Sequence, residues 1–459
     1  MEKLLKSDKR QRMELLLRIG CLLMESGADT SRIIRNVRRM AEHMGFKDNQ
    51  VSVFVDFHKV GVEIDDNHDP LVMFRRCERR GVNMAMLSDI SHLTFKAVSE
   101  EYTIEQYKEE LESIAHRKRS YSPWLTALAG GFACGGFCFL FGSDWMAFFY
   151  AAFAAMLGLR LRMWLDSHRM NPFITTCVVA FFSTLVAWLL GTMSVFAGVS
   201  TVLPTWLQSV TPWHPLMACA LFLIPGVPLI NFVNDMLSGY VLMGAGRATV
   251  TLLVVLSMAF GIGLAIKVFG IDNFVRDLSM VPHHSYWEYS LVAAISAVGF
   301  SMIFNTPPRL LWVVALGGCV AVCTRNFVSL GADSGNIGLG MGTLLGTLTG
   351  SVLVSLLFTR VVRWLNTPHH CLSIPSVIPM VPGVLMYRAL FAFIDMNGVV
   401  GEVTVAMHNA ITAMLIILFI AVGVAVPNIF FPKMMEKFPN LSQKMGAGNL
   451  KGVFRGKRS

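Results

Sequence analysis

An apolar run at 216–243 is interrupted by two prolines and a glycine. Pro225, Gly226 and Pro228 cannot all lie in a regular helix, because each proline removes an amide donor and its ring clashes with the preceding turn. The run is long enough to cross a bilayer, and hydrocarbon offers no water to the carbonyl groups that such a break frees. We therefore expect a broken transmembrane helix whose break is surrounded by protein or by a wet cavity.

The interruption has a second copy late in the chain. The pattern Ile-Pro-x-Val-Pro occurs at 224–228 and again at 378–382, where it runs on into Gly383. Broken helices at matching places in two halves indicate the binding site of a secondary transporter. A half-helix that begins near Gly226 or Gly383 points free N–H groups at the break and favours an anion there. We expect the two breaks to meet in a polar chamber midway through the membrane.

Composition excludes a soluble globular protein. The 459 residues are 54% hydrophobic and 15% charged, with a mean hydropathy of +0.55, whereas soluble domains carry about 25% charged residues. The net charge of +9 comes mostly from the N-terminal segment, short loops and the tail, which indicates membrane topology and no nucleic acid. The nine cysteines lack zinc spacing. No nucleotide-binding or hydrolase motif occurs, so we expect neither an enzyme, nor a cofactor, nor a metal.

The chain after residue 120 contains about ten apolar runs, each long enough to cross a bilayer. Basic residues gather at the ends predicted to lie inside, which places both termini in the cytoplasm and the chain in the cytoplasmic (inner) membrane. Five spans in each half insert the two halves in opposite directions and so predict an inverted repeat. The predicted spans are 123–142, 145–162, 172–191, 215–243, 248–269, 287–305, 309–325, 336–359, 373–395 and 403–427.

The first 120 residues are charged and contain no spanning run. Helical apolar spacing at 13–19 and alternating residues at 50–57 and 60–64 predict a small cytoplasmic α+β domain. The expected fold is thus a polytopic α-helical membrane protein with a 5+5 inverted repeat behind this domain. The predicted order is 1–120 for the cytoplasmic domain, 121–270 for the first membrane half, 271–432 for the second half, and 433–459 for a basic cytoplasmic tail.

Polar side chains follow the first break and are candidates for substrate binding. Asn231 lies three and four residues before Asn234 and Asp235, so on a helix it shares a face with both. A carboxylate inside an apolar span marks a pathway or a binding site. Asn231 and Asp235 are suited to hold an ammonium group or a coupling proton. The alternative is that they cap the half-helix or bond to a neighbour.

The second break offers a different set of candidates. Arg388 follows Pro382 at the spacing that separates Asn234 from Pro228, and an arginine that faces a cavity binds a carboxylate in a bidentate manner. An ion pair with Asp235 or snorkelling to the membrane surface is the other interpretation. The remaining substrate-binding candidates are Pro225, Gly226, Pro382, Gly383 and Tyr387, for which packing is the alternative, and His408 is a candidate for proton coupling, against a structural hydrogen bond.

A compact polar stretch, Ser-Gly-Ala-Asp-Thr-Ser-Arg at 26–32, lies in the N-terminal domain. It is interpreted either as a turn with a helix cap or as a loop that contacts a ligand or a gate. Together with Pro225 to Pro228, Asn231, Asp235 and the Pro379 to Gly383 stretch, it makes the chain resemble the threonine/serine exporter (ThrE-type) family. The resemblance covers nearly the whole chain. It implies a soluble N-terminal domain, about ten membrane helices in two related halves, and export of a small amino acid or a related carboxylate.

Three functions follow as hypotheses. The first is a proton-coupled secondary transporter that exports threonine, serine or a similar small polar carboxylate by alternating access. The second is an exporter of a dicarboxylate such as succinate. The third is a membrane-anchored signalling or sensor protein whose cytoplasmic domain binds a ligand. The expected partners are the substrate and the lipid bilayer, and the sequence leaves open whether the chain forms a homo-oligomer.

Overall fold

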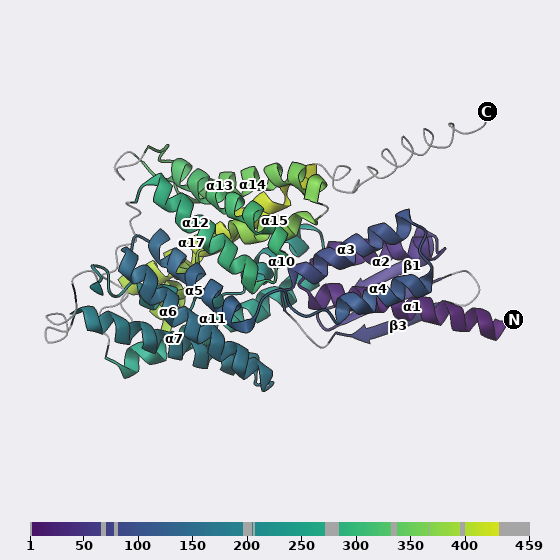
Figure 1. Ribbon diagram of the computed structural model, residues 1–459, viewed down its shortest axis with the longest axis horizontal. Coiled ribbons are helices and arrows are strands. Elements are labelled where there is room, and N and C mark those ends of the chain that lie inside the picture. The colour runs from purple at the N-terminus through teal and green to yellow at the C-terminus, as the bar shows by residue number, and fades with distance from the viewer. Residues whose placement is uncertain are drawn as a thin grey trace, which may run out of the picture.

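The computed structural model describes residues 2–65, 70–77, 81–195, 204, 207–270, 284–331, 337–365, 367–394 and 400–430. The predicted tail at 433–459 lies outside these residues. An N-terminal region of four helices and one sheet stands at one end of the molecule, and an all-helical part makes up the rest (Figure 1). Both parts contact each other directly.

The N-terminal region has three layers. Helices α1 (Glu2–Glu25) and α2 (Thr30–His43) lie between the sheet and the pair α3 (Met84–Ser99) and α4 (Ile104–Ala115). Burial on two sides explains why α1 is apolar nearly all round at Leu15, Leu16 and Leu17. An ion pair also joins two of the layers: Arg18 on α1 donates to both carboxylate oxygens of Glu112 on α4, at 3.0 and 3.1 Å.

The sheet is antiparallel with the strand order β1-β2-β3. Strands β1 (Val51–Val55) and β2 (Lys59–Ile64) pair with Val53 opposite Val62. Strand β1 lies within the predicted stretch 50–57, and β2 begins one residue before the predicted stretch 60–64. Strand β3 (Leu71–Arg76) was not predicted from the sequence, because its short apolar stretch runs directly into two arginines at an exposed edge.

Every predicted span corresponds to a helix or to a broken helix. The intact helices are α5 (Pro123–Leu140), α6 (Trp145–Ser167), α7 (Pro172–Val195), α11 (Val241–Val268), α12 (Tyr286–Ile303), α13 (Leu311–Ser329), α14 (Thr343–Leu365) and α17 (Val400–Phe430). The broken ones are α9 (Pro215–Ala218) with η3 (Leu221–Leu223) and α10 (Gly226–Leu237), and α15 (His369–Val377) with η6 (Ile378–Met380) and α16 (Gly383–Ile394).

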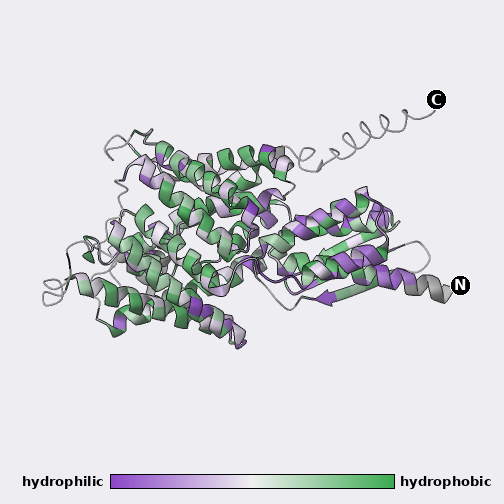
Figure 2. Ribbon diagram, in the orientation of Figure 1, coloured by the Kyte–Doolittle hydropathy of each residue, from purple (hydrophilic) through white to green (hydrophobic). Residues whose placement is uncertain are grey.

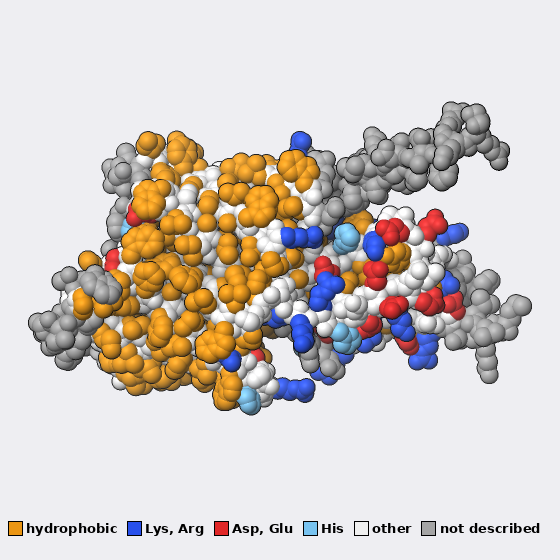
Figure 3. All heavy atoms as spheres, viewed as in Figure 1, with side chains coloured by type: hydrophobic (Ala, Val, Ile, Leu, Met, Phe, Trp, Pro, Cys, Tyr) orange, Lys and Arg blue, Asp and Glu red, His pale blue; other side chains and the backbone are white. Residues whose placement is uncertain are grey.

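The helical part is that of a multi-pass membrane protein. Among the described residues, seven helices are long and apolar enough to cross a membrane, and an eighth candidate, 215–237, bends by 60° at its break. The helical part is green in Figure 2 and covered by apolar side chains in Figure 3, whereas charged side chains gather over the N-terminal region. Large exposed residues such as Phe149, Leu252 and Leu316 are expected where lipid is the solvent.

The helices contact each other in a repeated pattern. Helix α5 packs on α6, α6 on α7, α7 on α11 and α10 on α11; in the same order α12 packs on α13, α13 on α14, α14 on α17 and α16 on α17. Between the two groups α5 packs on α12, while α10 packs on α17 and α16 on α11. Each group therefore places its half-helix against the last helix of the other group.

Candidate functional site

The two helix breaks share one backbone geometry. In each, a 3-10 turn is followed by one extended residue, Ile224 (φ −63°, ψ 124°) or Val381 (φ −62°, ψ 130°), and then by proline and glycine. The glycine N–H donates to the carbonyl two residues earlier at 2.8 Å in both cases. Helices α10 and α16 begin at Gly226 and Gly383. Both half-helices thus begin where the sequence predicted.

The equivalent residues differ from those that the sequence pattern suggested. The two Ile-Pro-x-Val-Pro copies pair Pro225 with Pro379, but the backbone pairs Pro225 with Pro382. The pattern was out of register by three residues, because the geometry depends on an extended residue before the proline and a glycine after it. Arg388 therefore corresponds to Asn231, and the predicted match with Asn234 was wrong.

The breaks meet each other inside the helical part. A Cβ atom at Gly226 would lie 2.5 Å from Ile378 Cδ1, and one at Gly383 would lie 2.8 Å from Leu221 Cδ2. Since Ile378 and Leu221 each begin the 3-10 turn of a break, the two contacts are reciprocal. A side chain at either glycine would have to displace the end of the facing side chain, so glycine makes this approach easier.

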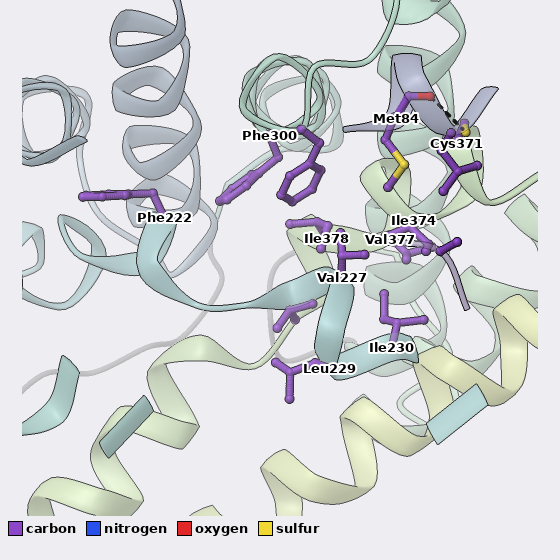
Figure 4. Close-up of a cluster of buried hydrophobic side chains, with 14 of the residues drawn as sticks. Met84, Phe222, Val227, Leu229, Ile230, Phe300, Cys371, Ile374, Val377 and Ile378 are labelled. Atoms are coloured by element: carbon purple, nitrogen blue, oxygen red, sulfur yellow. Dashed lines mark hydrogen bonds between the residues drawn. The ribbon is translucent and has the colours of Figure 1, made fainter. Parts of the chain in front are cut away.

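The space between the breaks is apolar. The cavity there holds about 10 Å³, room for about one water molecule, and it is lined by side chains such as Phe137, Phe300, Ile224 and Val381. Figure 4 shows Ile378, Val227 and Phe300 grouped around this place. The prediction that the breaks meet agrees with the structure, but the polar chamber expected between them is absent from the described residues.

The polar side chains of α10 lie beyond the break and face the N-terminal region. The Asn231 amide donates to the Gly27 carbonyl at 2.9 Å, and Asp235 Oδ1 accepts from the Thr30 N–H at 2.9 Å. Arg247 on α11 forms an ion pair with Asp235 Oδ2 at 3.1 Å. The Arg247 guanidinium also donates to the Ala28 carbonyl at 2.7 Å. Three side chains of the helical part thus bind three backbone groups of one loop.

The loop is shaped by its own sequence. Gly27 has φ +86°, a conformation that glycine adopts without strain. Asp29 caps α2 through the Arg32 N–H and pairs with the Arg32 guanidinium at 3.2 Å. Burial alone would raise the pKa of Asp29, but the charges of Arg32 and Arg35 and the hydrogen bond from Arg32 outweigh it and hold the pKa well below its usual range. Asp29 is thus a fixed anion.

The contact is buried on both sides. The exposed fraction is 1% for Asp235, 9% for Arg247 and 1% for Thr30. The sequence did not mark Arg247 as a site residue, because a basic residue at a helix end is usually a topology signal. The signal available was its place as the first cation after Asp235, at the start of the next apolar run.

The other candidates lie apart from this contact or cannot be placed. Asn234 is buried on α10, whereas His408 is exposed on α17. Arg388 reaches α9, where its Nη2 atom lies 3.9 Å from Met217 Sδ. Tyr387 lies on α16, but its side chain is outside the described residues. Asn231 and Asp235 are brought together as predicted, and Asp235 contacts Arg247 and Thr30.

The N-terminal region has a second contact with the helical part, on the other group of helices. The N–H groups of Met84 and Ala85 donate to the carbonyls of Phe304 and Asn305 at 2.9 and 3.1 Å. The Asn305 side chain donates to Asn83 and accepts from the Ser120 N–H. A cavity of about 310 Å³ beside this contact is lined by Arg117, Lys118 and Arg309 among others.

Comparison with known proteins gives two matches to one family. The model described as a threonine/serine exporter, ThrE, matches residues 14–269, and a second ThrE model matches residues 289–430. The first match covers more than half of the chain. No solved structure matches the chain.

Relatives of two kinds are similar to the chain. The "Probable threonine/serine exporter" of Mycobacterium tuberculosis is 23% identical over 97% of this chain and 79% of its own length. The "Threonine/serine exporter" of Corynebacterium glutamicum is 20% identical over 87% of this chain and 79% of its own length. The "Probable succinate transporter subunit YjjP" of Escherichia coli is 26% identical over 58% of this chain and 98% of its own length. From the family match, the order of its motifs and the broken membrane helices, the chain belongs to the threonine/serine exporter (ThrE) family.

Proposed function

We propose that this protein is a secondary transporter that exports small amino acids, threonine or serine, across the cytoplasmic membrane with proton coupling. The observation that carries the proposal is the reciprocal contact of two broken helices, Gly226 against Ile378 and Gly383 against Leu221. Half-helices that meet inside a membrane protein form the substrate path of secondary transporters. The relatives named as exporters support this class over an enzyme.

The repeated packing of the helices supports a 5+5 architecture. Helices α5 to α11 form one half and α12 to α17 the other, and each half has the same order of neighbours. With five crossings in each half the second half is inserted the opposite way, so α10 and α16 run from the breaks toward opposite faces. Arg247 and Arg309 lie beside the N-terminal region, since Arg247 donates to the Ala28 carbonyl and Arg309 lines a cavity with Asn83 and Arg117. Their position supports a cytoplasmic location for that region and for both termini. The predicted inner ends also carry Arg160, Arg162, Arg169 and Arg360.

Alternating access assigns roles to the predicted residues. Asp235 with Asn231 takes the substrate amine or the coupling proton on the cytoplasmic side. Arg388 and the half-helix start at Gly383 take the carboxylate after the breaks have parted. Asn234, Pro225, Gly226, Pro382 and Tyr387 line this path, and His408 is the second candidate for proton coupling.

The decisive experiment is threonine efflux from preloaded cells that carry Asp235→Asn. We expect efflux to be abolished while the amount of protein in the membrane is unchanged, because the amide keeps the shape but cannot pair with an ammonium group or a proton. Asp166→Asn is the matched control, since Asp166 is an exposed carboxylate at the end of α6. Efflux by Asp235→Asn at the wild-type rate overturns the role of Asp235.

A dicarboxylate exporter is the second candidate, because one group of relatives is named after succinate. Competition in membrane vesicles distinguishes the two substrates. Uptake of labelled succinate is measured with excess threonine, and uptake of labelled threonine with excess succinate. The stronger competitor is the substrate that the carrier prefers. A signalling protein is the third. Flux of any substrate through a chain that lacks residues 1–119 excludes it, since an anchor alone moves nothing.

A further inference from the structure

The contact between the helical part and the N-terminal loop has an unusual composition. Asn231, Asp235 and Arg247 each contact a backbone group of residues 27–30, and Asp235 and Arg247 also pair with each other. The loop presents two carbonyl oxygens, of Gly27 and Ala28, and one N–H donor, of Thr30. The helical part therefore binds a donor with its carboxylate and a pair of acceptors with its guanidinium and its amide.

A free α-amino acid presents the same groups. Its ammonium group is a donor suited to a carboxylate, and its carboxylate is an acceptor suited to an arginine and an amide. We propose that Asp235, Arg247 and Asn231 form a site for the ammonium and carboxylate groups of one α-amino acid, and that the loop Gly27–Thr30 occupies this site as a substitute for the substrate. The Asn231 amide serves both groups, because its oxygen accepts from the ammonium and its NH2 donates to the carboxylate. The inference rests on the proposed function and deepens it, because it names the chemistry that the site recognises.

Because the site is buried under the loop, the loop and the substrate cannot occupy it at the same time, and binding of one favours release of the other. Asp235 and Arg247 are almost fully buried under the loop and pair with each other, so the loop supplies only the N–H and the carbonyl that complete their hydrogen bonding. Buried polar groups that lack such partners are costly. When the loop leaves, an amino acid restores both pairings. Release of the loop is therefore promoted by the ligand that replaces it.

The loop also sets a threshold for export. A tethered competitor acts at an effective concentration in the millimolar range. Substrate must exceed this competition before it occupies the site, so export begins only when the amino acid accumulates in the cytoplasm. A dicarboxylate replaces the loop poorly, because its second carboxylate would face the carboxylate of Asp235.

The substitution Thr30→Pro tests the substitute role of the loop with little harm to the fold. Thr30 is the first residue of α2, the helix position where proline is best tolerated. Asp29 before it already has φ −70° and ψ 155°, the conformation that a following proline requires. Proline removes the N–H that Asp235 accepts. Thr30→Ala is the matched control, because it shortens the side chain and keeps the N–H.

Binding of threonine and of succinate to the purified full chain is measured by calorimetry, and loop exposure by hydrogen exchange at residues 27–33. We expect Thr30→Pro to bind threonine about tenfold more tightly than Thr30→Ala, because a hydrogen bond to a charged group no longer holds the loop. Threonine should speed exchange of the loop amides in the wild type, and succinate should not. Arg247→Lys, which keeps the charge but not the two-donor geometry, should weaken threonine binding.

Each result decides one question. Equal or weaker threonine binding by Thr30→Pro, or loop amides that exchange no faster with threonine bound, overturns the substitute role. Succinate binding that tightens in Thr30→Pro as threonine binding does would overturn the assignment to an α-amino acid. The proposed function fails separately. It is wrong if protein that binds threonine by calorimetry shows no threonine flux after reconstitution into vesicles.

Discussion

Arg388 occupies on α16 the position that Asn231 occupies on α10, since each lies five residues after the glycine that begins its half-helix. The two side chains face different surroundings. Asn231 binds the Gly27 carbonyl of the N-terminal region, whereas Arg388 reaches Met217 on α9. Equivalent positions on the two half-helices thus carry an amide on α10, facing the N-terminal region, and a cation on α16, facing α9.

Replacing this cation tests its role. We expect Arg388→Gln to lower the initial rate of threonine efflux from preloaded cells by at least about tenfold, because a carboxylate loses its charged partner in a low-dielectric place. Arg388→Lys should retain part of the rate, since it keeps the charge and loses the planar pair of donors. Met217→Leu is the control for packing. Normal efflux by Arg388→Gln at equal protein amounts would remove Arg388 from the substrate path.

The breaks must separate if substrate passes between them. In a chain whose native cysteines are replaced, Gly226→Cys combined with Ile378→Cys puts two thiols at the contact, since a Cβ atom at Gly226 would lie 3.9 Å from Ile378 Cγ1. We expect oxidation to stop efflux and a reducing agent to restore it, while each single cysteine variant is insensitive. Flux that continues through the oxidised pair would show that the breaks stay together during transport.

Asp144, which caps the start of α6, contributes to the stability of the fold in a pH-dependent way. Burial would raise the pKa of Asp144, but hydrogen bonds from Thr211 and Ser209 and from the backbone outweigh burial and lower the pKa below its ordinary value. A lowered pKa in the folded state stabilises the fold above the unfolded pKa of about 3.9. This contribution disappears as the pH falls through the folded value.

The matching variant is Asp144→Asn, which keeps the helix cap. We expect its thermal midpoint in detergent to lie a few degrees below that of the wild type at pH 7, a loss of about 1–2 kcal/mol. The difference should shrink as the pH is lowered below about 4. A difference that is constant from pH 7 to pH 3 would contradict a charged Asp144.

Close packing of α5 on α6 depends on Gly131. A Cβ atom there would lie 2.4 Å from the backbone oxygen of Ala152, which cannot turn away as a side chain does. We expect Gly131→Ala to cost about 1–3 kcal/mol of stability by forcing the helices apart, seen as a lower thermal midpoint. Gly401→Ala near the start of α17 is the control, because a Cβ there meets nothing within 4 Å. Equal midpoints would show that α5 and α6 can slide.

Much of the fold follows from the sequence because apolar run length and proline have strong local effects. The ten predicted runs all contain helices, and α10 and α16 begin at the predicted glycines Gly226 and Gly383. The match to the threonine/serine exporter family confirms the resemblance that the motifs at 26–32 and 225–235 indicated. Strand β3 was missed, since an edge strand with one exposed face has a weak pattern.

The site was harder to predict, because its partners are distant in sequence. Asp235 was marked as a costly carboxylate in an apolar run, and the structure buries it against Arg247 and the Thr30 N–H. Nothing local indicates that Thr30 lies against it, or that Arg247 is more than a topology charge. The alignment of the two breaks was also wrong. The two short motifs share the pattern Ile-Pro-x-Val-Pro, but the backbone geometry matches the Pro-Gly pairs at 225–226 and 382–383.

The crossed packing of α10 on α17 and of α16 on α11 means that neither half is self-sufficient. A polypeptide that ended at Gly270 would present the unsheltered flanks of α10 and α11 to lipid, and only a second polypeptide with the remaining helices would shelter them. Joining the halves in one chain guarantees a one-to-one supply of two interlocked pieces. It fixes their stoichiometry rather than their architecture.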